Sequence, residues 1–308
     1  MKRLLVHLHA FYADQVPYFL ERLTALEGTA WDLYVTCVRD DPQLREAILA
    51  FRPDAHLILV ENAGYDVWPF ISLLRQVPLD RYDYVLKLHT KNRAPRKTLS
   101  VNGVFLPGFR WRNLLVEALL GSPERFRETL ALLEDDPSAG MACCGALLKK
   151  LSRVQPDDTF LLREEMDHIG LPLKGDRFCA GTMFLARVEP FRFFAGRWPA
   201  PAGHDVDASR HSRLERESID AELFRGESGT HRSWSPAHVY ERILSLCVPA
   251  AGYRIVPVKS LLYYYVQAVR PLGPALQSIF RLDREYPSGD KVLTLFGLRF
   301  VVAKRKGV

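Results

Sequence analysis

Apolar and polar positions along the first third of the chain alternate between short apolar runs and helical patterns. The apolar runs, which have the length and composition of buried strands, are residues 3–9, 31–38, 55–60 and 82–88. Between them, apolar residues recur with the period of amphipathic helices at residues 14–26, 42–51 and 67–77. This alternation predicts an α/β fold: a mostly parallel, Rossmann-like sheet with helices on both faces.

The remainder of the chain continues the pattern less regularly. Helices are predicted at residues 109–120, 123–134, 159–169 and 235–247, and strands at residues 139–144, 178–186 and 252–258. Loops are predicted at residues 91–107 and at the start of residues 195–229, whose later part is polar and helical in pattern. Residues 261–269 fit a helix or a strand, and residues 292–302 are apolar around a glycine. We expect one domain over residues 1–258 and a C-terminal extension with a basic tail over residues 259–308.

Composition is that of an ordinary globular protein, with 48% apolar and 25% charged residues among 308. No run of 18 apolar residues occurs, and the N-terminus has the pattern of a strand and not of a signal peptide. The five cysteines form no CxxC pair, which favours reduced core residues and a cytoplasmic location. The net charge of +6 is compatible with phosphorylated substrates or anionic lipid, and no nucleic-acid-binding motif accompanies it.

The apolar run at residues 82–88 ends in a cluster of cations. Lys87, His89 and Lys91 alternate, so they lie on one face if the strand continues. In open α/β sheets, ligands bind at the carboxyl ends of the strands. These cations therefore predict a site for an anion such as a diphosphate, whose developing charge they would stabilise. The alternative is a strand that ends in a solvated basic loop.

A sharp turn with an acidic residue is predicted after the strand at residues 55–60. Asn62 and Gly64 tolerate a positive φ, which suits a turn that brings backbone close to a ligand. Asp66 follows at the start of the next helix. The alternative is that Asp66 serves only as the N-cap of that helix.

Residues 178–184, FCAGTMF, have the composition of an apolar strand with an internal glycine. Gly181 would let a sugar ring approach the backbone closely. The alternative is an ordinary strand of the core.

Groups that could bind a metal or act as bases lie later in the chain. His204, Asp205, Asp207 and His211 could hold manganese, magnesium or zinc, although a solvated loop also fits them. A carboxylate among Asp220, Glu222 and Glu227 could deprotonate an acceptor hydroxyl. His238 shares a helix face with Glu241 and Arg242. Each of these residues could equally be a surface charge.

Taken together, these stretches resemble the rhamnan synthesis protein F family of bacterial polysaccharide glycosyltransferases. The resemblance runs in the family's order over about residues 4–258. The motifs stand here as VHLHAFY (6–12), ENAGYDVWPF (61–70), YDYVLKLHTKN (82–92), WRNLLVEALLGS (111–122), FCAGTMFLAR (178–187) and AHVYER (237–242).

The resemblance implies a nucleotide-sugar-binding fold of the GT-A kind and a role in assembling rhamnose-containing lipopolysaccharide O-antigen or capsule. The implied reaction transfers a deoxysugar, rhamnose from dTDP-rhamnose, to a lipid-linked glycan. The implied partners are a nucleotide-sugar donor, the lipid-linked acceptor and an anionic membrane surface, with no nucleic acid. The protein is expected to be peripheral on the cytoplasmic face of the membrane and to need no cofactor, and a divalent metal stays an alternative.

The family's motifs map onto three sets of residues. The set implied for the donor nucleotide and diphosphate is Asn62, Gly64, Asp66, Lys87, His89 and Lys91. The set implied for the sugar and acceptor is Gly181, Thr182, Met183, Phe184, His238, Glu241 and Arg242. The predicted base is Glu227, with Asp220 and Glu222 behind it.

Two positions depart from the family pattern. The family's Glu-x-Gly-Gln-x-Asp-Gly-Thr keeps only Glu227 and Gly229 here, so its Asp is missing. Leu185 replaces an aromatic residue after Met-Phe, a change that could alter the sugar accepted. The missing Asp favours an alternative function, a non-catalytic binding module of a polysaccharide-assembly complex.

Overall fold

The computed structural model divides the chain into two compact units, Met1–Lys259 and Ser260–Val308. Sequence analysis placed a boundary after residue 258. The residues that the structure describes are 2–92, 100–102, 104–153, 156–195, 219, 221–225, 235–269, 280–284, 291–295 and 298–303.

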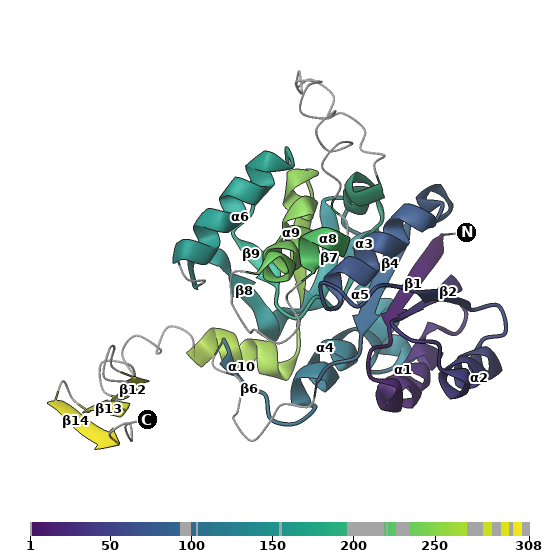
Figure 1. Cartoon of the computed structure of the whole chain (residues 1–308). Coiled ribbons are helices and arrows are strands. Elements are labelled where there is room, and N and C mark those ends of the chain that lie inside the picture. The colour runs from purple at the N-terminus through teal and green to yellow at the C-terminus, as the bar shows by residue number, and fades with distance from the viewer. Residues whose placement is uncertain are drawn as a thin grey trace. The chain divides into compact units, whose positions relative to one another are not determined.

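A seven-stranded sheet forms the centre of the described part of the first unit (Figure 1). Its order is β11-β7-β10-β4-β1-β2-β3, and β10 runs antiparallel to both of its neighbours while the other pairs are parallel. The bounds are β1 Arg3–His9, β2 Ala30–Cys37, β3 His56–Leu59, β4 Tyr84–His89, β7 Ala139–Cys144, β10 Phe184–Arg187 and β11 Arg254–Val258. The predicted α/β class with a mostly parallel sheet is confirmed.

Helices cover both faces of this sheet. On one side α3 packs against α9, which also contacts α6 and the short α8; on the other side α1, α4 and α5 form a layer, with α2 against α1. The bounds are α1 Val16–Leu23, α2 Pro42–Phe51, α3 Val67–Gln76, α4 Arg110–Leu120, α5 Pro123–Glu134, α6 Pro156–His168, α8 Ala221–Phe224 and α9 Pro236–Ala250. Small strands complete the unit: β5 Ser100–Val101 with β6 Val104–Phe105, and β8 Leu148–Lys150 with β9 Arg177–Cys179.

Local capping explains why two predicted helices have the expected bounds. Asp41 precedes α2, and its carboxylate accepts hydrogen bonds from the amides of Gln43 and Leu44. Ser122 precedes α5 in the same way and accepts from the amide of Arg125. Both helices begin with proline, which is pre-organised for the first helical position.

The predicted strand at residues 178–186 is wrong as a single element. It splits into β9, which pairs with β8, and β10, which joins the main sheet. Gly181 and Thr182 between them have φ of +92° and +46°, a left-handed conformation that no strand contains. The apolar composition of the segment concealed this turn, which is stabilised by contacts with distant residues.

The core on the α3 face is rich in aromatic rings. Phe184 of β10 stacks on Phe191 with ring centroids 5.4 Å apart, and both meet the ring of Phe70 from α3 edge to face. All three side chains are fully buried. These contacts fix α3 against the reversed strand β10, and so against the carboxyl end of β4.

The second unit contains a helix and a small sheet. Residues Leu261–Val269 form helix α10, which decides between the two alternatives for that segment. Strands β12 Phe280–Arg284, β13 Lys291–Leu295 and β14 Leu298–Ala303 form an antiparallel sheet. The apolar stretch at residues 292–302 is therefore mostly the two arms of one hairpin. Among the described residues, no helix has the length and apolar character that a membrane span requires.

Substitution Gly140→Ala tests how tightly α9 and β11 pack on β7. A methyl group there would lie 2.4 Å from Cβ of Tyr253 and 2.8 Å from Cγ1 of Val248. We expect a loss of about 1–3 kcal/mol in the free energy of unfolding, measured by urea denaturation, because the core must open to admit it. An unchanged unfolding midpoint would contradict this packing.

Candidate functional site

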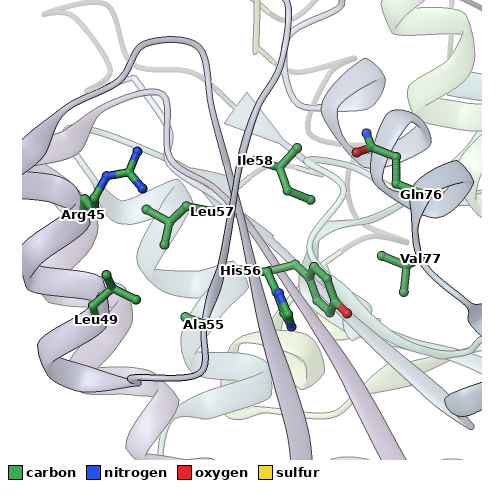
Figure 2. A pocket seen from close by; sticks show the side chains of 9 residues that line it. Arg45, Leu49, Ala55, His56, Leu57, Ile58, Gln76 and Val77 are labelled. Carbon is green, nitrogen blue, oxygen red and sulfur yellow. The ribbon is translucent and has the colours of Figure 1, made fainter.

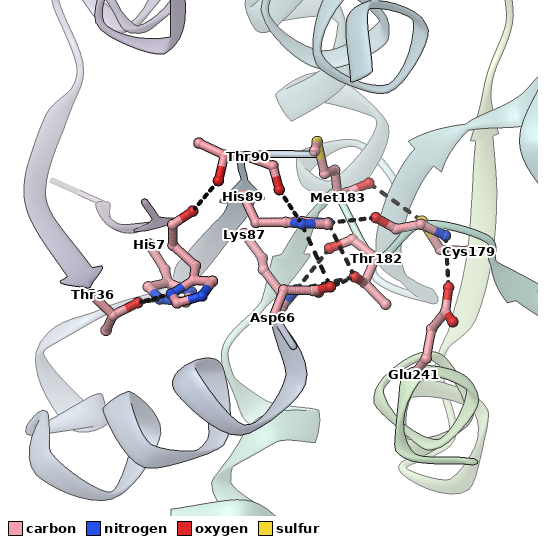
Figure 3. Close-up of polar contacts among 12 residues, drawn as sticks. His7, Thr36, Asp66, Lys87, His89, Thr90, Cys179, Thr182, Met183 and Glu241 are labelled. Carbon is pink, nitrogen blue, oxygen red and sulfur yellow. Dashed lines mark hydrogen bonds and ion pairs between the residues drawn. The ribbon is translucent and has the colours of Figure 1, made fainter. Parts of the chain in front are cut away.

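Polar side chains gather where β1, β2 and β4 end, within the central sheet. The strand register pairs His7 with Lys87 and His9 with both His89 and Thr36. All five residues are buried. Together with Asp66 at the start of α3 and Thr182 before β10 they form a contiguous group, called the polar cluster below and drawn in Figure 3. The cluster lies at the carboxyl edge of the parallel strands, as sequence analysis predicted.

The centre of the polar cluster is an ion pair between Lys87 and Asp66. The ammonium of Lys87 donates to Oδ2 of Asp66 at 2.5 Å and to the carbonyl and hydroxyl oxygens of Thr182, each at 3.1 Å. Its side chain is 0% exposed. An ammonium has three hydrogens, so each of its donors has a protein acceptor.

The same pair gives Asp66 a role beyond the helix start. Its carboxylate makes no capping hydrogen bond to α3 and instead accepts from Lys87 and from the hydroxyl of Thr182. Burial alone would raise the pKa of this carboxyl, but the charges of His89, Lys87 and Lys91 outweigh burial and hold the pKa well below its usual range. The interpretation of Asp66 as an N-cap is thereby wrong for its side chain.

The left-handed turn at Gly181 and Thr182 is held by the polar cluster. Nε2 of His89 lies 2.8 Å from the carbonyl oxygen of Gly181, and because a carbonyl only accepts, Nε2 carries the proton. Thr182 is β-branched and adopts a positive φ, which costs of order 1–3 kcal/mol. Its two hydrogen bonds from Lys87 and its donation to Asp66 offset that cost.

Two further histidines share one threonine hydroxyl at the ends of β1 and β2. Nε2 of His7 and Nδ1 of His9 lie 2.8 and 3.0 Å from Oγ1 of Thr36. The ring of His7 also stacks on Phe70, with centroids 5.4 Å apart. Burial lowers the pKa of His7 well below its ordinary value and lowers the pKa of His9 to about 4, so both imidazoles are neutral at pH 7.

Lys91 lies at the edge of the polar cluster and is half-buried. Its ammonium lies over the indole of Trp111, 4.5 Å from the ring centroid, and burial lowers its pKa. Among the described residues, the ammonium has no hydrogen-bond acceptor. The buried Gln15 holds the backbone of Lys91 from both sides, since its amide donates to the Lys91 carbonyl at 2.7 Å and accepts from the Lys91 amide at 3.3 Å.

Helix α9 supports the Gly181 turn from the other side. Oε1 of Glu241 accepts from the amide of Gly181 at 2.9 Å, and the hydroxyl of Ser245 accepts from the amide of Cys179 at 3.0 Å. Figure 3 shows Glu241 reaching from its helix toward this turn. The observed contact of Glu241 is with backbone, and its assignment to a sugar and acceptor pocket stays a prediction.

The other two predicted residues of α9 have separate surroundings. His238 is half-buried, with Nδ1 2.6 Å from the hydroxyl of Ser235 and its ring edge to face with the exposed Tyr65 at 5.9 Å. Arg242 is buried, and its guanidinium lies over the ring of Phe178, 5.8 Å from the centroid. Arg242 therefore packs against the core.

The structure changes the physical role of several predicted residues. Lys87 is enclosed by protein acceptors, so the prediction that it touches a diphosphate directly is corrected to a supporting position behind Asp66. Met183 and Phe184 are 0% exposed, and we correct their assignment to a sugar pocket: they are core residues.

The predicted turn before α3 is present in a modified form. Gly64 has a φ of +59°, as expected, but the second left-handed residue is Tyr65 and not the exposed Asn62. The space that Gly64 leaves is taken by the ring of Phe224, 2.8 Å from where a Cβ would lie, and not by a ligand. A glycine is therefore required at position 64 so that the Phe224 ring can pack against the turn.

Several predicted residues lie outside the described part of the chain. They are His204, Asp205, Asp207, His211, Asp220 and Glu227. Glu222 lies in α8, and its side chain is outside the part that the structure describes. Within the described ranges, no group of three or more His, Cys, Asp or Glu residues is arranged to hold a metal ion.

A separate surface hollow lies at the edge strand β3 (Figure 2). Its walls come from β2, β3, α2 and α3 and their ends, and the ring of Tyr34 stacks on His56 there with centroids 4.5 Å apart. The residues that line it are Tyr34, Arg45, Leu49, Ala55, His56, Leu57, Ile58, Gln76 and Val77. None of them belongs to the polar cluster.

Sequence reasoning missed five residues that shape the site: His7, His9, Gln15, Thr36 and Trp111. Each is a polar or amphipathic residue within an apolar pattern, and each makes its contact over a long sequence distance. His7 and His9 lie in the matched stretch VHLHAFY, and Trp111 opens the matched stretch WRNLLVEALLGS. Those positions were the available signals.

Removing the charge of Asp66 should destabilise the fold. In Asp66→Asn the ammonium of Lys87 stays buried without a counter-charge, which we expect to cost about 3 kcal/mol in the free energy of unfolding. The double variant Asp66→Asn with Lys87→Met should recover more than half of that loss, because no charge is then left buried. Urea denaturation measures both.

Asp54→Asn, in an exposed pair with Arg52, should change stability by less than about 1 kcal/mol. Equal losses at positions 54 and 66 would contradict the buried pair.

The histidine pair on Thr36 should make stability depend on pH. Both folded-state pKa values are lowered, so the unfolded chain binds protons first as the pH falls below about 6.5. Stability should be complete above that pH and should fall toward pH 4, by about 1.4 kcal/mol per pH unit for each histidine. Urea denaturation at pH 7.5 and 5.0 measures this slope, and His9→Gln should make it shallower. A slope that His9→Gln leaves unchanged would refute the assignment.

Two curated proteins are similar in sequence to most of this chain. The "Uncharacterized protein WxcX" of two strains of Xanthomonas campestris pv. campestris is 26% identical over 265 residues, which are 83% of this chain and 33% of that protein. The chain thus spans about a third of the length of these curated relatives.

Similarity to solved structures is weak. Two crystal structures of S. aureus TarS 1-349 align, one of them in complex with UDP-GlcNAc. The complex has a TM-score of 0.34 and 13% identity over 65% of this chain and 49% of that chain. The second has a TM-score of 0.36 and 12% identity over 89% and 66%.

The profile of the family described as "Rhamnan synthesis protein F" matches residues 1–171, more than half of the chain. The polar cluster draws most of its members from this range, including Asp66, Lys87 and His89. The chain belongs to the rhamnan synthesis protein F family.

Proposed function

We propose that this chain is a glycosyltransferase of bacterial polysaccharide synthesis that uses a nucleotide-sugar donor. The finer form of the proposal is transfer of a deoxysugar, rhamnose from dTDP-rhamnose, to a lipid-linked glycan of lipopolysaccharide O-antigen or capsule. Family membership supports the class of reaction. A peripheral location on the cytoplasmic membrane face follows from the lipid-linked acceptor.

The observation that carries the proposal is the state of Lys91. Its ammonium lies at the carboxyl edge of the sheet, half-buried, over an indole ring and without a protein acceptor in the described part of the chain. A partly desolvated cation of this kind favours binding of a compact anion. A lysine ammonium binds a phosphate group as a point charge. Lys91 is therefore the proposed direct contact to the donor diphosphate.

The rest of the polar cluster holds that cation and its surroundings in place. Gln15 fixes the backbone of Lys91, and the Lys87–Asp66 pair fixes the turn against which the side chain of Lys91 packs. Groups that are held before the substrate arrives need no reorganisation as charge develops on the leaving diphosphate. Asp66 and His89 act as positioning residues in this proposal, while Asn62 stays a proposed contact to the nucleotide.

The proposed base is Glu227, with Asp220 and Glu222 as alternatives. Asp66 is a poor base, because its pKa is held well below its usual range and its oxygen accepts from Lys87 and Thr182. Glu241 already accepts from the amide of Gly181 through one oxygen. We therefore assign the base for direct attack by an acceptor hydroxyl to a carboxylate among residues 220–227. A metal site at His204, Asp205, Asp207 and His211 is the alternative to the metal-free reaction.

A donor screen tests the reaction class. Purified protein is incubated with a lipid-linked acceptor and a series of nucleotide sugars, with and without a chelator, and release of nucleoside diphosphate is measured. We expect release from dTDP-rhamnose that the chelator leaves unchanged. Loss of transfer with chelator would overturn the metal-free mechanism. Release from no donor would favour the non-catalytic binding module, which the missing Asp before AHVYER also favours.

Neutralising Lys91 tests the diphosphate contact. Lys91→Ala should lower kcat/KM by about 100-fold or more, because one preorganised charge on the leaving group is lost. The exposed Lys174 belongs to none of the contacts described above, and Lys174→Ala should retain the native rate. Thermal unfolding checks that both variants are folded. A Lys91→Ala rate equal to that of Lys174→Ala would remove Lys91 from the diphosphate site.

A further inference from the structure

The second unit, Ser260–Val308, combines exposed apolar side chains with positive charge. It holds eight Lys and Arg against three Asp and Glu, a net charge of +5 out of +6 for the whole chain. It also holds Leu261, Tyr264, Tyr265, Leu295, Leu298, Phe300 and Val301, which are more than half of the large hydrophobic side chains exposed in the described residues. The first unit has a net charge of +1, since the whole chain has +6 and the second unit +5, and exposed large hydrophobic side chains are sparser among its described residues.

The strand register places several of these side chains on one face of the small sheet. Phe300 of β14 pairs with Leu293 of β13, and Leu298 pairs with Leu295. Residues that pair across strands, and residues two apart in one strand, point to the same face. Leu293, Leu295, Leu298 and Phe300 therefore form one apolar face, called the hairpin face below. Leu298 is 65% and Phe300 48% exposed.

We propose that the hairpin face is a docking surface for an anionic membrane. Exposed apolar side chains in a unit of net positive charge are the combination that partitions into the lipid interface, where apolar groups enter the acyl boundary and cations attract acidic headgroups. The tyrosines of α10 suit the same interface, since an aromatic ring with a polar tip favours headgroup depth. A net +5 within 49 residues selects an anionic surface over a neutral one.

The inference rests on the proposed function for its setting, because a lipid-linked acceptor requires the protein at the membrane. It goes further in naming the surface that makes contact. It also predicts that membrane binding and sugar transfer are separate properties of the two units, since none of the polar-cluster residues belongs to the second unit.

Vesicle sedimentation of the full chain tests the proposal without donor or acceptor. Vesicles contain either phosphatidylcholine alone or phosphatidylcholine mixed with the anionic lipid phosphatidylglycerol, whose negative surface potential attracts cationic segments. We expect at least about tenfold more bound protein on the anionic vesicles, and a decrease in binding as NaCl is raised. Equal binding to both vesicles, or no binding to either, would overturn the proposal.

Substitutions on the two faces of the sheet locate the contact. Leu298→Thr with Phe300→Thr keeps β-propensity and removes apolar area, and should lower the partition coefficient about tenfold or more. Val301 is exposed but pairs with Val292 on the opposite face, so Val301→Thr should change binding less than about twofold. Equal effects of the two changes would place the contact elsewhere and refute the hairpin face.

Transfer to a water-soluble acceptor, measured in parallel, separates the two proposals. The Leu298→Thr, Phe300→Thr variant should keep its rate there, which also shows that the first unit is folded. Lost vesicle binding with retained transfer supports the hairpin face. Absence of transfer in the native chain would overturn the proposed function and leave the membrane result to stand independently.

Discussion

The buried ion pair between Lys87 and Asp66 is the interaction on which the rest of the site depends. It joins the end of β4 to the start of α3, two segments that the sheet alone does not connect. Through Thr182 it also fixes the turn before the reversed strand β10. Taking two charges from water is expensive, and the cost is offset only when the remaining donors and acceptors are satisfied. Here the hydroxyl and carbonyl of Thr182 satisfy them.

As a consequence of that pairing, the two lysines at the end of β4 have different surroundings. Lys87 is neutralised inside the protein. Lys91, four residues later, lies over an aromatic ring, and burial lowers its pKa although the carboxylates of Asp66 and Glu241 act in the opposite direction. The two lysines look equivalent in the sequence. The structure separates them because β4 ends at His89, and the chain beyond it follows the contacts of Gln15 and no longer the pleat of the strand.

The order of strands and helices could be predicted from the sequence because short local patterns determine it. Proline at the first position of α2 and α5, with Asp41 and Ser122 before them, marks helix starts without reference to the rest of the fold. The reversed strand could not be predicted in this way. Residues 178–186 are apolar throughout, and the left-handed turn within them depends on Lys87, more than 90 residues earlier. For the same reason Phe184 resembled a pocket residue until its packing on Phe191 was known.

The glycine at position 181 has a consequence for how this site can vary. The indole of Trp111 and the methylenes of Lys91 occupy the space where a side chain at that position would lie. The shape of the site and the position of its cation therefore depend on the same residue. A larger residue at position 181 would move both the Trp111 indole and the Lys91 side chain. A substitution at position 181 therefore cannot change the shape of the site without also moving its cation. Variation in what the site accepts is left to positions whose side chains reach solvent, such as Tyr65 and His238, where one residue can change while the charge stays in place.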